Sequence, residues 1–220
     1  LCAEGVTSQD CLTAPQVAAL EVADHPFVFP YSMPNGVTSV GPFPALLGAD
    51  TKIWFGNGTP ASVAGFYAPG RVFPWSLDNS RIDKATWQSA VLETARVYDA
   101  SSSDFDGLQK RDGKLIIVQG TLDMLVPNAM TDHFFESVKA RYGSATRNFV
   151  RYYVTPGFGH GDGAFRMEWD ALDALDQWVG TGRAPRRPVA TDRGTEAPGR
   201  SRPLCEYPYW PKYKGKGSIN

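Results

Sequence analysis

The sequence predicts an α/β fold, and two observations carry this prediction. Residues 114–119 and 149–155 form apolar, β-rich runs, the first ended by Gly120 and the second by a Pro-Gly turn, as is typical of buried strands. Each run is followed by a short loop that holds one titratable side chain, Asp123 after the first and His160 after the second. In open α/β sheets, the loops at the carboxyl ends of the strands usually carry the functional groups.

Residues 127–142, between the two runs, predict a helix that begins with a proline and is ended by Gly143. Its apolar side chains recur at every fourth position, as expected for one buried face: Met130, Phe134, Val138 and Tyr142. A strand–helix–strand unit connected by a right-handed crossover has parallel strands. The loops of Asp123 and His160 should therefore open at the same edge of the sheet, where a carboxylate could orient an imidazole.

The order of Asp123 and His160 along the chain is that of the acid and the base in an α/β-hydrolase, in which a nucleophile precedes both. We therefore expect a partial α/β-hydrolase fold. No G-x-S-x-G nucleophile motif occurs among the 220 residues, so the nucleophile is expected upstream of Leu1, unless there is none. Purely structural roles compete with catalysis: Asp123 could cap the helix, and His160 could be a loop residue bonded to backbone.

The N-terminal part predicts a compact cap rather than a regular sheet. Thr13 and Gln16 have the spacing of a capping box and predict a short helix. Residues 24–74 are rich in proline and glycine without a sustained period. Eleven of the 27 aromatic residues lie between Phe27 and Trp87, which favours an ordered segment packed by rings. A second helix is predicted over residues 83–98.

A polar connector follows this helix and suggests a domain boundary. Residues 99–107 contain serines and three aspartates, which we interpret as a solvated linker because their spacing is not that of a known calcium loop. We expect a cap over residues 1–103 and the sheet-bearing domain over residues 104–220. In that domain a further helix is predicted over residues 164–179, and the tail from Gly180 is expected to lie on the surface as extended chain.

Composition limits the partners and the compartment. The 22 basic and 23 acidic residues give a formal charge of −1, so nucleic acid and anionic membranes are not expected partners. No apolar run approaches the length of a membrane span. Cys2 and Cys11 lie close enough in sequence to close a short disulfide loop, which leaves Cys205 alone; three reduced thiols are the alternative.

Four stretches resemble, in order and spacing, the C-terminal half of the tannase and feruloyl esterase family: KLIIVQGTLDMLVP, PGFGHGDGAF, ALDALDQWVGTGRAP and RPLCEYPYWPKYKGKG. The N-terminal part, with Cys2 ahead of Cys11, resembles that family's lid. The resemblance implies an α/β-hydrolase fold with an inserted lid and a secreted or periplasmic serine esterase of aromatic acids such as gallate, ferulate or a terephthalate monoester. It implies that Asp123 is the triad acid and His160 the triad base, with the serine in an upstream half of the same protein.

The chain departs from the family pattern in three places. Most members have a disulfide-bonded cysteine directly after the catalytic histidine, whereas His160 is followed by Gly161. Many members hold a structural calcium in a loop that precedes the cysteine matching Cys2, so that loop is absent here. The cysteine matching Cys205 normally pairs with one that would lie beyond Asn220. No cofactor is expected for catalysis.

Three further hypotheses remain open. His160 and Asp162 could be two metal ligands, but no third ligand is evident in the sequence nearby. Aromatic side chains of the cap could line a pocket for an aromatic acyl group, or simply fill the cap's own core: Phe43, Trp54, Phe55, Phe66, Tyr67, Phe73 and Trp75. The chain could also be a binding or structural module that keeps the hydrolase scaffold without its chemistry.

Overall fold

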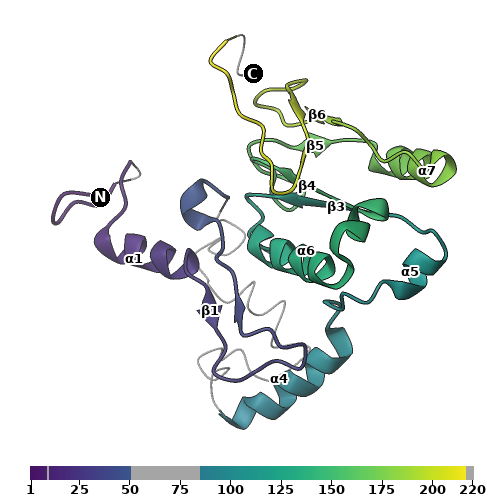
Figure 1. Ribbon diagram of the computed structural model, residues 1–220. Coiled ribbons are helices and arrows are strands. Elements are labelled where there is room, and N and C mark those ends of the chain that lie inside the picture. Colours follow the sequence, from purple (N-terminus) through teal and green to yellow (C-terminus); the bar gives the residue numbers. More distant parts are fainter. Residues whose placement is uncertain (9, 51–84, 217–220) are drawn as a thin grey trace. The chain divides into compact units, whose positions relative to one another are not determined.

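The computed structural model describes residues 1–8, 10–50 and 85–216. The chain divides into two compact units, Leu1–Ser102 and Ser103–Asn220 (Figure 1). The division lies beside the boundary expected after residue 103. The interpretation of the first unit as a lid stays a prediction.

The first unit contains two α-helices and a very short hairpin among its described residues. Helix α1 (Ala14–Ala23) begins after Thr13, whose backbone N–H and hydroxyl both donate to Gln16 Oε1, as the capping-box spacing predicts. Strands β1 (Phe27–Val28) and β2 (Ser39–Val40) pair antiparallel, and a single 3-10 turn, η1 (Ala45–Leu47), follows. Helix α4 (Ala85–Tyr98) ends where expected; residues 83 and 84 lie outside the described part of the chain. A disulfide joins Cys2 to Cys11, which confirms that pairing.

The second unit is built on a three-stranded sheet of order β3-β4-β8. Strands β3 (Leu115–Gly120) and β4 (Val150–Thr155) run parallel in full register, which confirms the predicted strand pair. Strand β8 (Cys205–Glu206) pairs antiparallel with the other edge of β4. Since β4 lies in the middle, its side chains are buried on both faces of the sheet. A short helix, α5 (Asp106–Lys110), precedes β3.

Helix α6 (Asn128–Tyr142) joins β3 to β4 and covers one face of the sheet (Figure 1). Its bounds agree with the prediction, but its buried side chains are Phe135 and Val138, and Met130 is 38% exposed. Each residue turns an α-helix by about 100°, so a strict four-residue repeat drifts by about 40° a step. Over two steps this drift, about 80°, carries Met130 off the face that Val138 occupies. The 3-10 segment η4 (Gly143–Asn148) then leads into β4.

The opposite face of the sheet is covered by a second cluster of apolar side chains, which comes mostly from the C-terminal third of the chain. Tyr153 of β4 contributes its ring there, together with Phe165, Ala190 and Leu204. The last three residues lie on or beside a second three-stranded sheet of order β5-β6-β7. Its strands are β5 (Met167–Glu168), β6 (Val189–Asp192) and β7 (Ser201–Pro203). Helix α7 (Ala171–Thr181) also packs on this side of β3 (Figure 1).

Two predictions about this third of the chain are wrong. The helix expected over residues 164–179 begins only at Ala171, because the Asp170 carboxylate accepts the N–H of Asp173 and caps it there. Phe165 is fully buried in the core, not placed on a helix. The tail is not simply extended surface chain, since it forms β6, β7 and β8.

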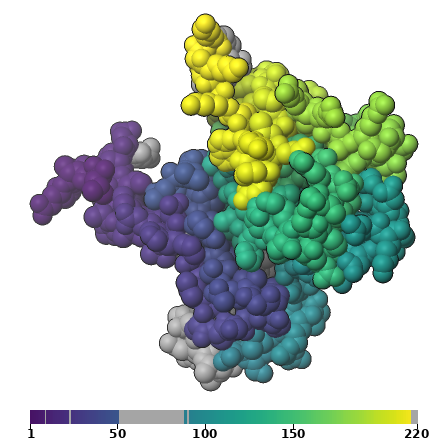
Figure 2. Space-filling model, viewed as in Figure 1, coloured from purple at the N-terminus to yellow at the C-terminus, as the bar shows by residue number. Residues whose placement is uncertain are grey.

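Figure 2 shows the C-terminal segment, in yellow, packed directly against the green surface formed by α6. Tyr207 makes this contact: its ring lies 5.8 Å from Phe135 of α6 and 5.2 Å from Tyr152 of β4, measured between ring centroids. The C-terminal segment thus completes the core under α6. Among the described residues, no helix is long and apolar enough to cross a membrane.

Candidate active site

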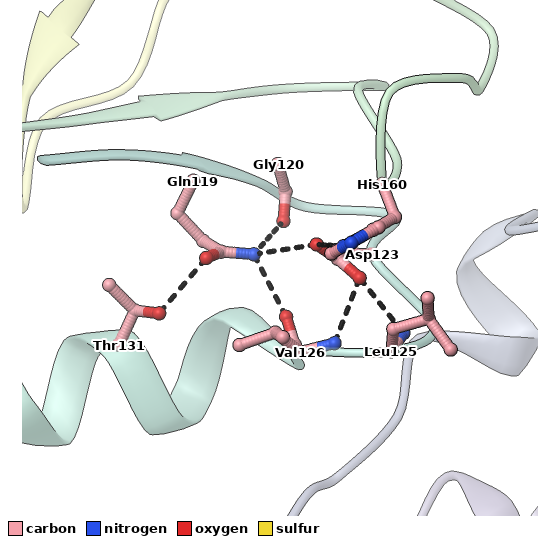
Figure 3. Close-up of polar contacts among 7 residues, drawn as sticks. All are labelled: Gln119, Gly120, Asp123, Leu125, Val126, Thr131 and His160. Carbon is pink, nitrogen blue, oxygen red and sulfur yellow. Dashed lines mark hydrogen bonds and ion pairs between the residues drawn. The ribbon is translucent and has the colours of Figure 1, made fainter. Parts of the chain in front are cut away.

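Asp123 lies three residues beyond the end of β3 and is only 6% exposed. One carboxylate oxygen, Oδ1, accepts the backbone N–H groups of Leu125 at 2.8 Å and Val126 at 2.9 Å (Figure 3). These bonds shape the turn that leads into α6. The competing structural role, a cap on the helix, is not what these bonds provide, because Leu125 and Val126 precede α6 and no side chain caps its first residues. The turn uses only one of the two carboxylate oxygens.

His160 lies on the loop of residues 156–166, which follows β4 and which we call the histidine loop. The loop that follows β3 and carries Asp123 is bonded to the histidine loop. Leu122 N–H donates to Phe158 O at 2.9 Å, and Gly157 N–H donates to Thr121 Oγ1 at 3.0 Å. A Cβ atom on Gly120 would lie 2.1 Å from Phe158 O, so the approach of the two loops requires a glycine at that position. The parallel strands thus bring both loops to one edge, as predicted.

The structure brings the two predicted catalytic residues together. His160 Nδ1 lies 2.9 Å from Asp123 Oδ2, the oxygen that the turn does not use (Figure 3). An ionised carboxylate only accepts, so Nδ1 carries the proton in this bond and a neutral imidazole has its lone pair on Nε2. The Asp123 side chain is 8% exposed and the His160 side chain 51%. Nε2 forms no hydrogen bond within the described part of the chain, and the imidazole is accessible for chemistry.

Gln119, at the end of β3, is a site residue that the sequence analysis missed. Its Nε2 donates to Val126 O at 2.8 Å and approaches Asp123 Oδ2 at 3.4 Å, while its Oε1 accepts the hydroxyl of Thr131 at 3.0 Å (Figure 3). The side chain is buried. The sequence did contain a signal for this residue, namely a glutamine at the end of an apolar run before Gly120. A buried amide must find hydrogen-bond partners, and these are expected nearby.

A hollow of about 380 Å³ opens beside the pair, and it is lined by Gln119, Gly120, Asp123 and His160 together with apolar side chains. Val118, Val126 and Phe158 supply that apolar lining. A space of this size beside an exposed imidazole could admit a second catalytic group and part of a small substrate.

The other candidate residues are placed as follows. The other two histidines lie apart from this pair: His133 is exposed on α6, and His25 Nδ1 bonds to Glu21 O in the first unit. Among the described residues, no group of three or more His, Cys, Asp or Glu side chains is placed to hold a metal ion. Phe43 is half-buried in the first unit. The other six candidates for an aromatic pocket lie outside the described residues: Trp54, Phe55, Phe66, Tyr67, Phe73 and Trp75.

Comparisons with known proteins agree with the resemblance noted in the sequence. A family model described as tannase and feruloyl esterase matches residues 63–220. An uncharacterized esterase of Agrobacterium fabrum is 31% identical over 241 aligned positions, which cover 99% of this chain and 43% of that protein. A mono(2-hydroxyethyl) terephthalate hydrolase of Piscinibacter sakaiensis is 35% identical over 130 positions, which cover 56% of this chain and 21% of that protein.

A solved structure, feruloyl esterase B from Aspergillus oryzae, superposes on the whole chain with a TM-score of 0.71 at 21% sequence identity. The chain covers 47% of that structure. This likeness confirms the fold class, a partial α/β-hydrolase fold. The chain spans about half the length of the relatives that it matches over its whole length.

Proposed function

Since this chain belongs to the tannase and feruloyl esterase family, we propose that it supplies the acid and the base of a carboxylic ester hydrolase whose nucleophile is a serine. The observation that carries the proposal is the 2.9 Å bond between His160 Nδ1 and Asp123 Oδ2, made by a residue that lines the hollow and whose side chain is 51% exposed. This is the arrangement of the acid and the base in a Ser-His-Asp triad.

In this mechanism Asp123 holds the imidazole in the tautomer that leaves Nε2 unprotonated. His160 Nε2 takes the proton of the serine hydroxyl as the serine attacks the ester carbonyl, and then returns the proton to the leaving alcohol. A water molecule, activated by the same nitrogen, releases the acid from the acyl-enzyme. Asp123 stays ionised throughout and stabilises the imidazolium that forms in each half-reaction.

The serine and the oxyanion donors belong, in this proposal, to an upstream half of the same protein. The absence of a G-x-S-x-G motif from these 220 residues supports this. So does the share of the relatives that the chain covers, 43% and 46% of the esterases from Agrobacterium fabrum and Xanthomonas campestris. The chain alone is accordingly expected to be inactive towards esters.

The proposed substrates are small esters of aromatic, phenolic acids. The apolar lining that Val118, Val126 and Phe158 give the hollow suits a flat ring better than a charged group. No cofactor takes part in the proposed chemistry. A structural calcium is proposed only for the complete protein, in a loop outside these 220 residues. Nucleic acid and membranes are not proposed as partners. The disulfide between Cys2 and Cys11 supports a secreted or periplasmic location.

The test uses the complete protein with methyl ferulate and methyl gallate as substrates. His160→Ala should lower kcat by about 10⁶-fold and Asp123→Asn by about 10⁴-fold, because the first removes the base and the second its orientation. His133→Ala is the matched control, since His133 is exposed on α6, and should leave kcat unchanged. Undiminished hydrolysis by His160→Ala would remove His160 as the base. A complete protein that has no serine nucleophile would leave a binding or structural module as the better interpretation.

A further inference from the structure

Two arginines of the β7 region reach the two ends of the histidine loop. Arg202 Nη1 donates to the carbonyl of Pro156, the first residue of the loop, at 2.7 Å. Arg200 Nη2 donates to the carbonyl of Ala164, near the other end. Both guanidinium groups also lie over the ring of Phe165, at 4.5 Å for Arg202 and 5.5 Å for Arg200. The loop is therefore held from outside at both ends.

The histidine loop needs such support because of its composition. Four of its residues are glycines, and three of them have positive φ: Gly157 (80°), Gly161 (94°) and Gly163 (93°). Glycine loses more conformational freedom on ordering than any other residue. The loop's own backbone bonds, Gly159 N–H to Asp162 O and Phe165 N–H to Gly157 O, close small rings. The bonds that hold the loop in place therefore come from other segments, namely the turn that carries Asp123 and the two arginines.

Gly157 and Arg202 fit each other closely. A Cβ atom at position 157 would lie 3.2 Å from Arg202 Nη1, tighter than an ordinary contact. The glycine therefore serves two needs, the positive φ and the space for the guanidinium. A loop that needed only apolar packing at this point would not require a half-buried guanidinium, whose partial desolvation has a cost. Burial lowers the pKa of Arg202 from its usual value, which is the signature of that cost.

Asp192 holds the second arginine and the end of the loop in one place. Its side chain is buried, and its Oδ1 accepts the N–H of Arg166 at 2.9 Å and the N–H of Gly194 at 2.8 Å. Its Oδ2 accepts Arg200 Nη2 at 2.6 Å and Nε at 3.1 Å. Although burial acts to raise the pKa of Asp192, these N–H donors and the Arg200 guanidinium hold the pKa below its usual value. The carboxylate is thus a fixed, ionised anchor behind the loop.

We propose that two arginines are positioning residues that set the His160 imidazole against Asp123: Arg202, and Arg200 with its anchor Asp192. This inference rests on the proposed function, because it concerns the base of the same pair. Within the described part of the chain, none of the three side chains forms a hydrogen bond or ion pair with His160. They bond instead to the backbone of the loop that carries it, at Pro156, Ala164 and Arg166. A displacement of about 1 Å at a reacting group can cost about 100-fold in rate.

The experiment compares Arg202→Met, Arg202→Lys and a control, Arg186→Met, in the complete protein with methyl ferulate as substrate. Arg186 lies in the same tail and is exposed, and no bond from its side chain is found in the described part of the chain. Arg202→Met should lower kcat about 10- to 100-fold and leave KM within about twofold, because substrate contacts remain while the base moves. Arg202→Lys keeps a donor for Pro156 O and should recover part of the loss. The control should match the wild type.

Two further readouts separate positioning from general stability. The low-field NMR resonance of a histidine Nδ1 proton bonded to a carboxylate, assigned by its loss in His160→Ala, should weaken or move in Arg202→Met and stay in Arg186→Met. Thermal unfolding gives the folded fraction of each variant at the assay temperature. If Arg202→Met does not fold, Arg202→Lys carries the test, with the same kcat, KM and NMR measurements.

The outcomes are distinguishable. The positioning role is overturned if the folded Arg202 variants have the same kcat as the control. It is also overturned if their kcat falls only in proportion to the unfolded fraction while the low-field resonance is unchanged. In either case, a loss of activity in His160→Ala would leave the proposed function standing. If His160→Ala is itself active, the proposed function fails, whatever the Arg202 variants do.

Discussion

At the residue scale, Asp123 divides its two oxygens between two tasks. Oδ1 holds the turn before α6 through two backbone N–H groups, and Oδ2 receives the imidazole. A cap on the helix and a catalytic acid were alternatives for Asp123, and its Oδ1 bonds hold the turn before α6 rather than the helix itself. The turn fixes the direction of the oxygen that faces His160, so this structural role is compatible with the proposed catalytic one.

Gln119 links this carboxylate to α6, and its loss is the first prediction at this scale. Gln119→Leu keeps the volume but leaves the Thr131 hydroxyl and the Val126 carbonyl without their partner. We expect the free energy of unfolding to fall by about 1–3 kcal/mol. We also expect kcat of the complete protein to fall roughly tenfold, because Asp123 Oδ2 loses the neighbouring amide of Gln119. Chemical denaturation and steady-state kinetics measure the two effects.

The matched control is Gln177→Leu on α7, where an exposed glutamine bonds to Asp173. An exposed substitution of this kind should change stability by less than about 0.5 kcal/mol. If Gln119→Leu behaved like this control in both measurements, Gln119 would have no part in holding the acid.

At the scale of the elements, the site depends on how closely two loops approach after two parallel strands. Gly120, the last residue of β3, faces the backbone of the histidine loop, and an added Cβ would lie 2.1 Å from Phe158 O. Backbone atoms cannot move aside as the end of a long side chain can. The distance between the Asp123 loop and the His160 loop is therefore set by the absence of a single side chain.

Gly120→Ala should accordingly destabilise the second unit by about 1–3 kcal/mol and lower kcat, because it forces the two loops apart. Gly180→Ala, in α7, is the matched control, since no atom lies within 4 Å of the added Cβ. The control should be neutral or stabilising by up to about 1 kcal/mol, as expected of alanine in a helix. Equal unfolding free energies for the two variants would contradict the close approach described here.

The sequence was informative where the determining interactions are local. The apolar runs before Gly120 and before Pro156 predicted β3 and β4, and the helix between them made the parallel pairing expected. The tail was not predictable in this way, because β6, β7 and β8 are two to four residues long. Such short strands carry no periodicity, and β8 exists through its pairing with β4, some fifty residues earlier. For the same reason the role of Asp192 could not be predicted, because its partners Arg166 and Arg200 lie on other segments of the chain.

At the scale of the whole molecule, the two units differ in what the described residues bury. The core of the second unit has two clusters, one on each face of its sheet. In the first unit only Pro44 and Ala45 are buried among the described residues. Phe27, Phe29 and Tyr31 pack ring against ring there. The disulfide between Cys2 and Cys11 adds a covalent constraint at the start of that unit.

This disulfide gives the prediction at the molecular scale. Protein prepared from an oxidising compartment should yield a peptide pair linking Cys2 to Cys11 in mass mapping without reductant, and the pair should separate when reductant is added. Protein kept in a reducing cytosol is the control and should show both cysteines alkylated. If Cys2 and Cys11 were alkylated in both preparations, the proposed secreted or periplasmic location would lose its support.

The distant origin of the histidine-loop anchors bears on how the protein is made. Arg202 lies 46 residues beyond Pro156, the position whose carbonyl it holds. A chain that grows from its N-terminus therefore exposes Asp123 and His160 well before the side chains that anchor the loop have been synthesised. Until β7 is in place, the strand pair can form while its acid and base remain loosely aligned. The acid and the base would then be fully aligned only after β7 has been synthesised.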